Sequence, residues 1–327
     1  MNIVRCFFCR SRKVIGAAIR AVIEVWVRYQ NKGEPPFELR DVYSFDDNRK
    51  KSESLLIVLA GYKDNLWDVV LDRIVKFAPS NLDVCVITSG LVVTELKRIC
   101  NERGWSYLAT ERNCLTLSQN IAINLHPDAK WIYKIDEDVF LTEGFFSALK
   151  KSYALAARET RSEIGMVAPL LNVNGYCYVK ILERMGKVSD WEKRFGALYY
   201  TEGLYQHTAI LKDPNAAKFM WQLGRLDDLN EKFAAEPQSY SISPYRFSIG
   251  AIMFTRDIWL DMGMFNVSVN GSDLGRDEEQ LCVYCLLHSK AKIICENSYV
   301  GHLAFGPQGK VMMDYYLSHK EQFCVKE

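Results

Sequence analysis

One stretch of the chain decides the fold: Trp131-Ile132-Tyr133-Lys134-Ile135-Asp136-Glu137-Asp138-Val139-Phe140. Its largely apolar first half is typical of a buried β-strand, and the strand ends in two carboxylates. Residues two apart point to the same side of an extended chain, so Asp136 and Asp138 emerge together if strand pairing ends near Ile135. Two acids held together repel each other, and a divalent cation relieves the repulsion. Mg²⁺ or Mn²⁺ suits such oxygen ligands and can also bind a substrate diphosphate.

The composition indicates a globular protein. With 327 residues, of which 49% are hydrophobic and 25% charged, the chain can bury one large core or two merged smaller ones. Its 41 basic and 40 acidic residues leave a formal net charge of +1, so no overall field attracts nucleic acid. The body of the chain also has no stripe of alternating basic and aromatic residues, and we expect no nucleic-acid partner.

The ten cysteines are scattered and mostly lie inside apolar stretches, as reduced thiols in a protein core do. This usage favours the cytosol. Two pairs, Cys6-x-x-Cys9 and Cys282-x-x-Cys285, have the spacing of metal ligands, and a four-thiolate zinc site is the minor interpretation. The residues around Cys282 and Cys285 have the pattern of the buried face of a helix, which is the interpretation we favour.

The N-terminal segment, residues 5–28, combines basic residues with apolar residues at helical spacing. It fits a helix that lies on an anionic membrane surface, and it fits equally well a helix packed on the domain. The apolar part, residues 14–27, is too short to span a bilayer and has no signal-peptide cleavage pattern. We expect a cytoplasmic protein, and a peripheral position on the inner face of the cell membrane stays open.

Strands and helices alternate after a linker at residues 29–54. Strands are expected at residues 55–60, 82–88, 106–109 and 131–135, and the helices between them begin near Asn65, Thr94 and Ser118. Such alternation predicts a parallel α/β sheet, whose ligands bind beyond the carboxyl ends of the strands. Gly61-Tyr62 and Asp136-Glu137-Asp138 both fall at such ends.

The order and spacing of residues 55–140 resemble the nucleotide-sugar half of a GT-A glycosyltransferase, close to glycosyltransferase family 2. The shared features are a strand that ends in a small-aromatic turn, a loop with Asn113, a helix with Ser118-Gln119-Asn120, and the strand that ends in Asp-x-Asp. The resemblance implies a Rossmann-like, mostly parallel central sheet flanked by helices, with a mixed acceptor-side half. The chain lacks the glycine and arginine of the family near Asn113 and Asn120, so no arginine contact to phosphate is carried over.

The second half of the chain supports the resemblance. Residues 248–254 and 263–266 look like the strand and turn of the family beside the acceptor, which implies an acceptor side at Gly250 and Ala251. His207 is a further candidate, in a loop over the acceptor. The run Asp277-Glu278-Glu279 opens a helix, where carboxylates are favoured by the helix dipole alone. The resemblance implies that one of these acids is the catalytic base. We favour Glu278, with Asp277 or Glu279 as alternatives.

The resemblance also implies a metal set and a set of donor contacts. His302 follows a strand near residue 295, where a GT-A histidine completes the metal site, although a histidine satisfied at a strand end is the simpler interpretation. The implied ligands of Mn²⁺ or Mg²⁺ are Asp136, Asp138 and His302. The implied donor contacts are Gly61, Tyr62, Asp64, Asn113, Asn120, Asp136 and Glu137.

These features predict four regions: an amphipathic helix and linker at residues 1–50, a nucleotide-sugar half at 51–145, an acceptor half at 146–305, and a loop and helix at 306–327. The implied function is metal-dependent, inverting transfer of a sugar from a nucleotide-sugar donor, with UDP-sugars favoured. The acceptor would be a hydroxyl of a glycan or lipid-linked glycan, in the biosynthesis of a cell-surface polysaccharide such as capsule or lipopolysaccharide.

Three other functions stay open. The run Asp136-Glu137-Asp138-Val139 also matches the motif of haloacid-dehalogenase-like phosphatases, although that motif normally opens the domain and here follows two strand-helix units. A nucleotidyltransferase would share the fold and the metal, but Gly61-Tyr62-Lys63-Asp64 is a poor phosphate loop. The third alternative is a catalytically inactive GT-A-like binding module. The presence of all the candidate acids and of His302 in one chain speaks against it.

Overall fold

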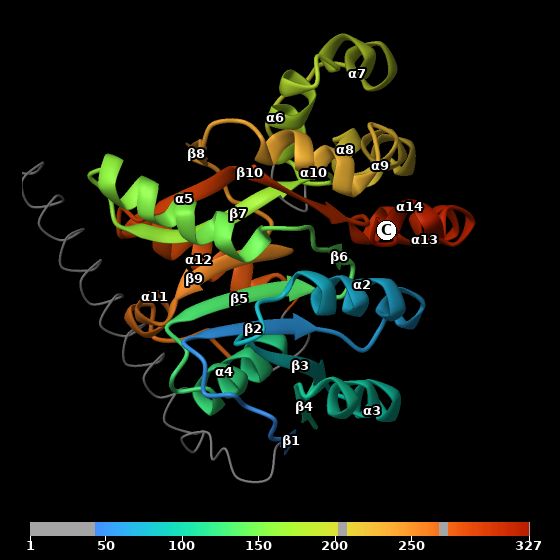
Figure 1. Cartoon of the computed structure of the whole chain (residues 1–327). Helices are drawn as coiled ribbons and strands as arrows, with labels where there is room; N and C mark the ends of the chain where they lie inside the picture. Colours follow the sequence, from blue (N-terminus) through green and yellow to red (C-terminus); the bar gives the residue numbers. More distant parts are fainter. Residues whose placement is uncertain (1–42, 202–207, 268–273, 327) are drawn as a thin grey trace, which may run out of the picture. The chain divides into compact units, whose positions relative to one another are not determined.

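The computed structural model describes residues 43–201, 208–267 and 274–326, which are built around a sheet of ten strands (Figure 1). The predictions for residues 5–28, for Cys6 and Cys9 and for His207 lie outside the described residues. The strand order is β1-β4-β3-β2-β5-β9-β7-β10-β6, and β8 pairs with β10. Among the described residues, no helix is both long and apolar enough to cross a membrane.

The first half of the sheet is parallel. Strands β2 (Ser54–Leu59), β3 (Asp83–Ser89), β4 (Ser106–Thr110) and β5 (Trp131–Asp136) lie side by side in the order β4-β3-β2-β5 with their arrowheads pointing the same way (Figure 1). The run from Leu55 to Val58 in β2 is fully buried, as expected for a parallel strand covered on both faces. The predicted parallel α/β sheet is therefore confirmed.

The helices between these strands are close to the predicted ones. Helix α2 (Asp64–Phe77) follows β2, α3 (Thr94–Arg103) follows β3, and α4 (Leu115–Leu125) follows β4. Gly104 ends α3 in the left-handed conformation with φ 66°, which a glycine adopts without steric cost. Helix α4 begins three residues before the predicted Ser118.

Residues 43–46, which the sequence placed in the linker, form strand β1 (Tyr43–Asp46) at the edge of the sheet. This strand pairs antiparallel with β4, so that Tyr43 faces Thr110. Its partner lies more than 60 residues along the chain, and four residues carry too little local pattern to predict the pairing.

The second half of the sheet is mixed, as predicted. Strand β9 (Ala251–Thr255) runs antiparallel to β5 and to β7 (Ile164–Leu171), and β7 is parallel to the long β10 (Ala291–His302). The short strands β6 (Val139–Phe140) and β8 (Tyr240–Ile242) both pair antiparallel with β10. Because β10 pairs with β6, His302 lies opposite Val139, next to Asp138.

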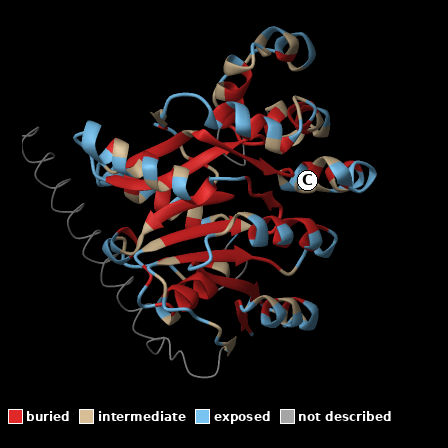
Figure 2. Cartoon of the chain, in the orientation of Figure 1, coloured by how far each residue is buried: buried red, intermediate tan, exposed pale blue. Residues whose placement is uncertain are grey.

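The remaining helices cover this half, and most show one buried and one exposed face (Figure 2). They are α5 (Phe145–Glu159), α6 (Cys177–Arg184), α7 (Val188–Phe195), α8 (Ala209–Lys212), α9 (Pro214–Trp221), α10 (Leu226–Ala234), α11 (Arg256–Asp261), α12 (Arg276–Leu287), η1 (Gly306–Gln308), α13 (Gly309–Ser318) and α14 (Lys320–Phe323). Cys282 and Cys285 are buried free thiols on α12, in agreement with the interpretation as a core helix face.

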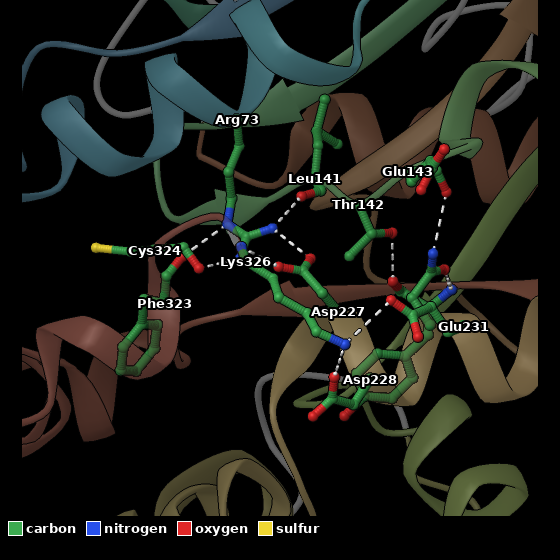
Figure 3. A network of polar contacts seen from close by, with 12 residues as sticks. Arg73, Leu141, Thr142, Glu143, Asp227, Asp228, Glu231, Phe323, Cys324 and Lys326 are labelled. Atoms are coloured by element: carbon green, nitrogen blue, oxygen red, sulfur yellow. Dashed lines mark hydrogen bonds and ion pairs between the residues drawn. The ribbon is translucent and has the colours of Figure 1, made fainter.

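A buried arginine ties distant parts of the chain together (Figure 3). Arg73 of α2 donates hydrogen bonds to the carbonyl oxygens of Leu141, Phe323 and Cys324 and to both carboxylate oxygens of Asp227, at 2.7–3.1 Å. The five N–H groups of the guanidinium therefore meet five acceptors. Residues 43–327 form one compact unit, so the predicted donor and acceptor halves share one sheet, and the boundaries at residues 145 and 305 stay predictions.

Candidate functional site

The ends of three strands bring the candidate residues together. Strand β5 ends at Asp136, its neighbour β9 begins just after Gly250, and β10 ends at His302. A Cβ atom added to Gly250 would lie 3.7 Å from Asp136 Oδ2 and 3.9 Å from His302 Cδ2. Because Gly250 has no side chain, Asp136 and His302 face a shared space above its backbone.

Asp138 and His302 form the centre of the site. His302 Nε2 lies 3.7 Å from Asp138 Oδ2, and both side chains are buried. His302 Nδ1 lies 2.8 Å from the carbonyl oxygen of Val173, which can only accept, so Nδ1 carries a proton. The second nitrogen, Nε2, faces the carboxylate of Asp138, and in a neutral imidazole it offers a lone pair to a cation. A histidine that donates one ring N–H to a carbonyl is the usual arrangement of a metal ligand.

A lysine also reaches Asp138. Lys63, which directly precedes α2, places its Nζ 2.5 Å from the same Oδ2. Burial alone would raise the pKa of Asp138, but the charges of His302 and Lys63 outweigh it and leave this pKa below its usual value. The pKa of Lys63 is raised, because attraction to Asp138 exceeds the opposing effect of burial. Asp138 is thus a charged carboxylate, and one of its oxygens faces both Lys63 and His302.

One oxygen of Asp136 pairs with Lys134, two residues earlier on β5. Its Oδ1 lies 2.7 Å from Lys134 Nζ, which also donates to the carbonyl oxygen of Ile249 at 3.0 Å. Burial raises the pKa of Asp136, and Lys134 offsets only part of this effect.

The predicted three-residue metal set differs from what the structure shows. In the part of the chain that the structure describes, no three His, Cys, Asp or Glu side chains are arranged around one metal position. The reason is local: β5 includes Asp136, and the chain turns at Glu137 and Asp138 before β6, so the alternation of an extended strand does not reach Asp138. Asp138 and His302 are brought together, and they fit a cation that takes its other ligands from water and a diphosphate.

Glu137 organises the turn after β2. Its carboxylate accepts hydrogen bonds from the backbone N–H groups of Gly61 and Tyr62 and from Trp67 Nε1, at 2.8–3.2 Å. Burial raises its pKa, and these hydrogen bonds oppose the rise. Glu137 therefore holds the backbone of the predicted donor turn. These hydrogen bonds alone account for the position of its buried carboxylate.

Three predicted donor residues lie exposed at the carboxyl ends of β2 and β3. The side chain of Tyr62 is 63% exposed, and its hydroxyl donates to the carbonyl oxygen of Ser89 at 2.8 Å. Asn113 packs against the turn after β3, because a Cβ atom on Gly90 would lie 2.5 Å from its Cβ. Asp64 is the first residue of α2 and is exposed to solvent.

Asn120 joins two parts of the fold through its side chain. Its Oδ1 accepts hydrogen bonds from Trp259 Nε1 and from the N–H of Phe265, both at 3.0 Å, and its Nδ2 donates to the carbonyl oxygen of Phe265 at 2.7 Å. These contacts join α4 to the segment after α11. The donor contact of Asn120 stays a prediction without a matching contact in the structure.

The three acids at the start of α12 have different surroundings. Asp277 is buried and accepts a hydrogen bond from Gln119 Nε2 at 3.0 Å, whereas Glu279 is exposed. Glu278 lies between these extremes. Its Oε1 is 2.8 Å from Arg246 Nε, and its Oε2 is 3.4 Å from the backbone nitrogen of Ile249.

Glu278 also contacts the backbone of Ile249, the residue before Gly250. The backbone of Ile249 contacts Glu278 through its nitrogen and Lys134 through its oxygen, so Glu278 and the Lys134–Asp136 pair flank one residue. Burial raises the pKa of Glu278 to about 7, although Arg246 opposes the rise. A carboxyl group that titrates near neutral pH can accept a proton there.

Sequence reasoning missed the three cations of the site: Lys63, Lys134 and Arg246. A lysine inside an apolar strand is unusual, so Lys134 carried a signal that it needs a buried partner. Lys63 stands where helix-capping side chains are favoured, which is a weaker signal. Arg246 lies in an irregular segment, and the neighbouring sequence gives no signal that it belongs to the site.

No family model matches the chain, and no curated protein matches it. Two solved glycosyltransferase structures are similar to it. GalNAc-T7 with UDP, GalNAc and Mn²⁺ is 13% identical with a TM-score of 0.46, over 85% of this chain and 52% of that one. The mannosyltransferase PcManGT from Pyrobaculum calidifontis, in complex with GDP-Man and Mn²⁺, is 15% identical with a TM-score of 0.44, over 93% of this chain and 71% of that one.

The chain spans about half the length of GalNAc-T7. Both matches are glycosyltransferases, the class that the sequence resembles, but likeness at these TM-scores carries no conclusion about activity. A relation to family 2 in particular stays a prediction.

Proposed function

We propose that this chain is a nucleotide-sugar-dependent glycosyltransferase in which Asp138 and His302 hold Mn²⁺ or Mg²⁺ and Glu278 is the base. One observation carries the proposal. A charged, buried carboxylate and an imidazole nitrogen face each other at 3.7 Å beyond a parallel strand, and a carboxyl group with a pKa of about 7 contacts Ile249, the residue before Gly250.

On the donor side, Asp138 and His302 would supply one carboxylate and one imidazole nitrogen to the cation. When bound, the cation would neutralise the negative charge that develops on the leaving nucleoside diphosphate. The exposed ring of Tyr62 offers a face to the base of the nucleotide. Asn113 and Asp64 offer polar groups at the same edge of the sheet, and Glu137 holds the backbone of Gly61 and Tyr62 in place.

On the acceptor side, Glu278 takes the proton of the attacking hydroxyl group. Arg246 fixes one carboxylate oxygen of Glu278, which leaves Oε2 as the oxygen nearer to the backbone of Ile249. The missing side chain of Gly250 leaves room for the sugar and the hydroxyl to meet beside Asp136. Ala251 continues this edge, and the predicted contact of His207 lies outside the described residues.

The finer assignments follow from the resemblance to family 2. They are inversion through a single displacement, a preference for UDP-sugars, and a glycan or lipid-linked glycan acceptor in capsule or lipopolysaccharide synthesis. A cytoplasmic position at the inner face of the membrane, through residues 5–28, belongs to the same proposal.

A thermal-shift experiment tests the proposal. We expect a nucleoside diphosphate or nucleotide sugar to raise the melting temperature of the wild type in the presence of Mn²⁺, because ligand binding stabilises the folded state by mass action. We expect Asp138→Asn to lose about a hundredfold or more in Mn²⁺-dependent donor affinity while staying folded. The control is Asp46→Asn, which removes a carboxylate paired with Lys97 at 3.0 Å on β1. A wild type that responds to no nucleotide would favour the phosphatase or binding-module alternative.

A further inference from the structure

Lys63 occupies a position that is unfavourable for the helix it precedes. It is the N-cap residue of α2, a helix of 14 residues, and its side chain makes no capping hydrogen bond. N-cap positions favour side chains that accept hydrogen bonds, and an ammonium group cannot accept one. Its charge also meets the positive end of the helix dipole. The local helix therefore gives no reason for a lysine here.

The side chain of Lys63 instead reaches into the candidate metal site. Its Nζ lies 2.5 Å from Asp138 Oδ2, the oxygen that also faces His302 Nε2 at 3.7 Å. Lys63 is the exposed member of this group, with 40% of its side chain accessible, against 4% for Asp138 and 9% for His302. The carboxylate and the imidazole are fixed in the protein interior, whereas the lysine enters from solvent on a flexible stem.

The hydrogen bonds of Lys63 are incomplete. Among the described residues, Asp138 is the single acceptor within hydrogen-bond distance of its Nζ, so one of three N–H donors is used. Lys134 differs, because its Nζ is buried and is held by both Asp136 and the carbonyl oxygen of Ile249. Lys63 can therefore leave Asp138 for another anion at little cost, and Lys134 cannot.

We propose that Lys63 is an exchangeable cation: it neutralises Asp138 while no donor is bound, and it moves to the diphosphate of the donor when a divalent cation binds between Asp138 and His302. This inference rests on the proposed function and adds a donor-binding residue to it. An ammonium group and a divalent cation on one oxygen would repel each other strongly at such short range. The diphosphate gives the ammonium a new partner, close to the N–H groups at the start of α2, which also favour an anion.

The experiment compares Lys63→Met with a matched control. Methionine keeps an unbranched side chain of similar length and removes the charge. The control is Lys97→Met, because Lys97 is 42% exposed and is paired with Asp46 at 3.0 Å, far from the site in sequence. Two affinities are measured by calorimetry: that of Mn²⁺ for the protein alone, and that of UDP or GDP for the protein in saturating Mn²⁺.

Exchange predicts changes of opposite sign. Lys63→Met binds Mn²⁺ about tenfold more tightly, because a competing positive charge is gone, and binds the nucleoside diphosphate about tenfold more weakly. Lys63→Arg keeps the charge and keeps the diphosphate affinity close to that of the wild type. Lys97→Met leaves both affinities unchanged.

Other results would overturn the inference. An unchanged Mn²⁺ affinity in Lys63→Met would show that the ammonium does not compete with the cation, and a parallel loss of both affinities would show a merely structural pair. In either case the proposed function stands if the wild type binds Mn²⁺ and a nucleoside diphosphate together. A wild type that binds neither would overturn both the proposed function and the exchange.

Discussion

The Arg73 cluster and the carboxylate site both bury ionised groups, and they differ in how completely these groups are paired. In the cluster, every guanidinium N–H of Arg73 has an acceptor, and both carboxylate oxygens of Asp227 accept hydrogen bonds from it (Figure 3). In the site, Asp138 shares one oxygen between Lys63 and His302, and burial raises the pKa of Glu278 to about 7. A complete network holds the fold together, whereas an incomplete one leaves charge for a ligand to balance.

The largest effect is expected from a substitution that breaks the complete network around Arg73. Arg73→Met leaves the Asp227 carboxylate and three carbonyl oxygens without their buried donor, and we expect a loss of about 3–5 kcal/mol in the free energy of unfolding. Lys63→Met removes a half-exposed partner and should cost less than about 1 kcal/mol. Urea denaturation of the two variants measures the difference. Equal losses would mean that the two regions do not differ as described.

A second substitution acts on chemistry rather than stability. Glu278→Gln should keep Mn²⁺-dependent donor binding and lower kcat about a thousandfold, because the base is gone and the shape is kept. Glu279→Gln changes the exposed neighbour and should stay within about twofold of the wild type, since general base catalysis needs contact with the acceptor hydroxyl. Steady-state kinetics with a fixed donor separates kcat from KM. Full turnover by Glu278→Gln would place the base elsewhere.

The smallest expected effect is the pH dependence. Activity should rise with pH through about 7, because Glu278 must be deprotonated to act as base. The free energy of unfolding should instead fall as pH rises over this range. Since the folded-state pKa of Glu278 lies above its unfolded value, its contribution to stability is fully present below about pH 4.5 and is lost as pH rises through about 7. Glu278→Gln should flatten this part of the stability profile. A profile unchanged by the substitution would contradict the raised pKa.

The fold could be predicted because its signals are local. The apolar run of β2, the strand that ends at Asp136 and the glycine after α3 each specify their own conformation within a few residues. Strand β1 could not be predicted, since Tyr43–Asp46 is stabilised by pairing with residues far along the chain.

The sequence indicated candidate site residues but not their contacts, and the roles of these residues stay predictions. The structure joins Asp138 to His302 and places Glu278 at Ile249, next to Gly250 in the chain. Their partners Lys63, Lys134 and Arg246 come from separate segments that only the folded chain joins. Asp136 and Asp138 have different partners, because β5 ends at Asp136 and Asp138 lies in the turn that follows. Likewise, the rotation of α12 decides that Glu278 faces Ile249 while Glu279 faces solvent.

The most direct test of the account is the coordination of Mn²⁺ itself. Pulsed electron paramagnetic resonance of the protein with Mn²⁺ and a nucleoside diphosphate reports nitrogen ligands and phosphorus atoms near the metal. We expect one histidine nitrogen coupling that disappears in His302→Gln, together with phosphorus coupling from the diphosphate. A spectrum with phosphorus coupling but no histidine nitrogen, unchanged in His302→Gln, would contradict the assignment of Asp138 and His302 as the cation site.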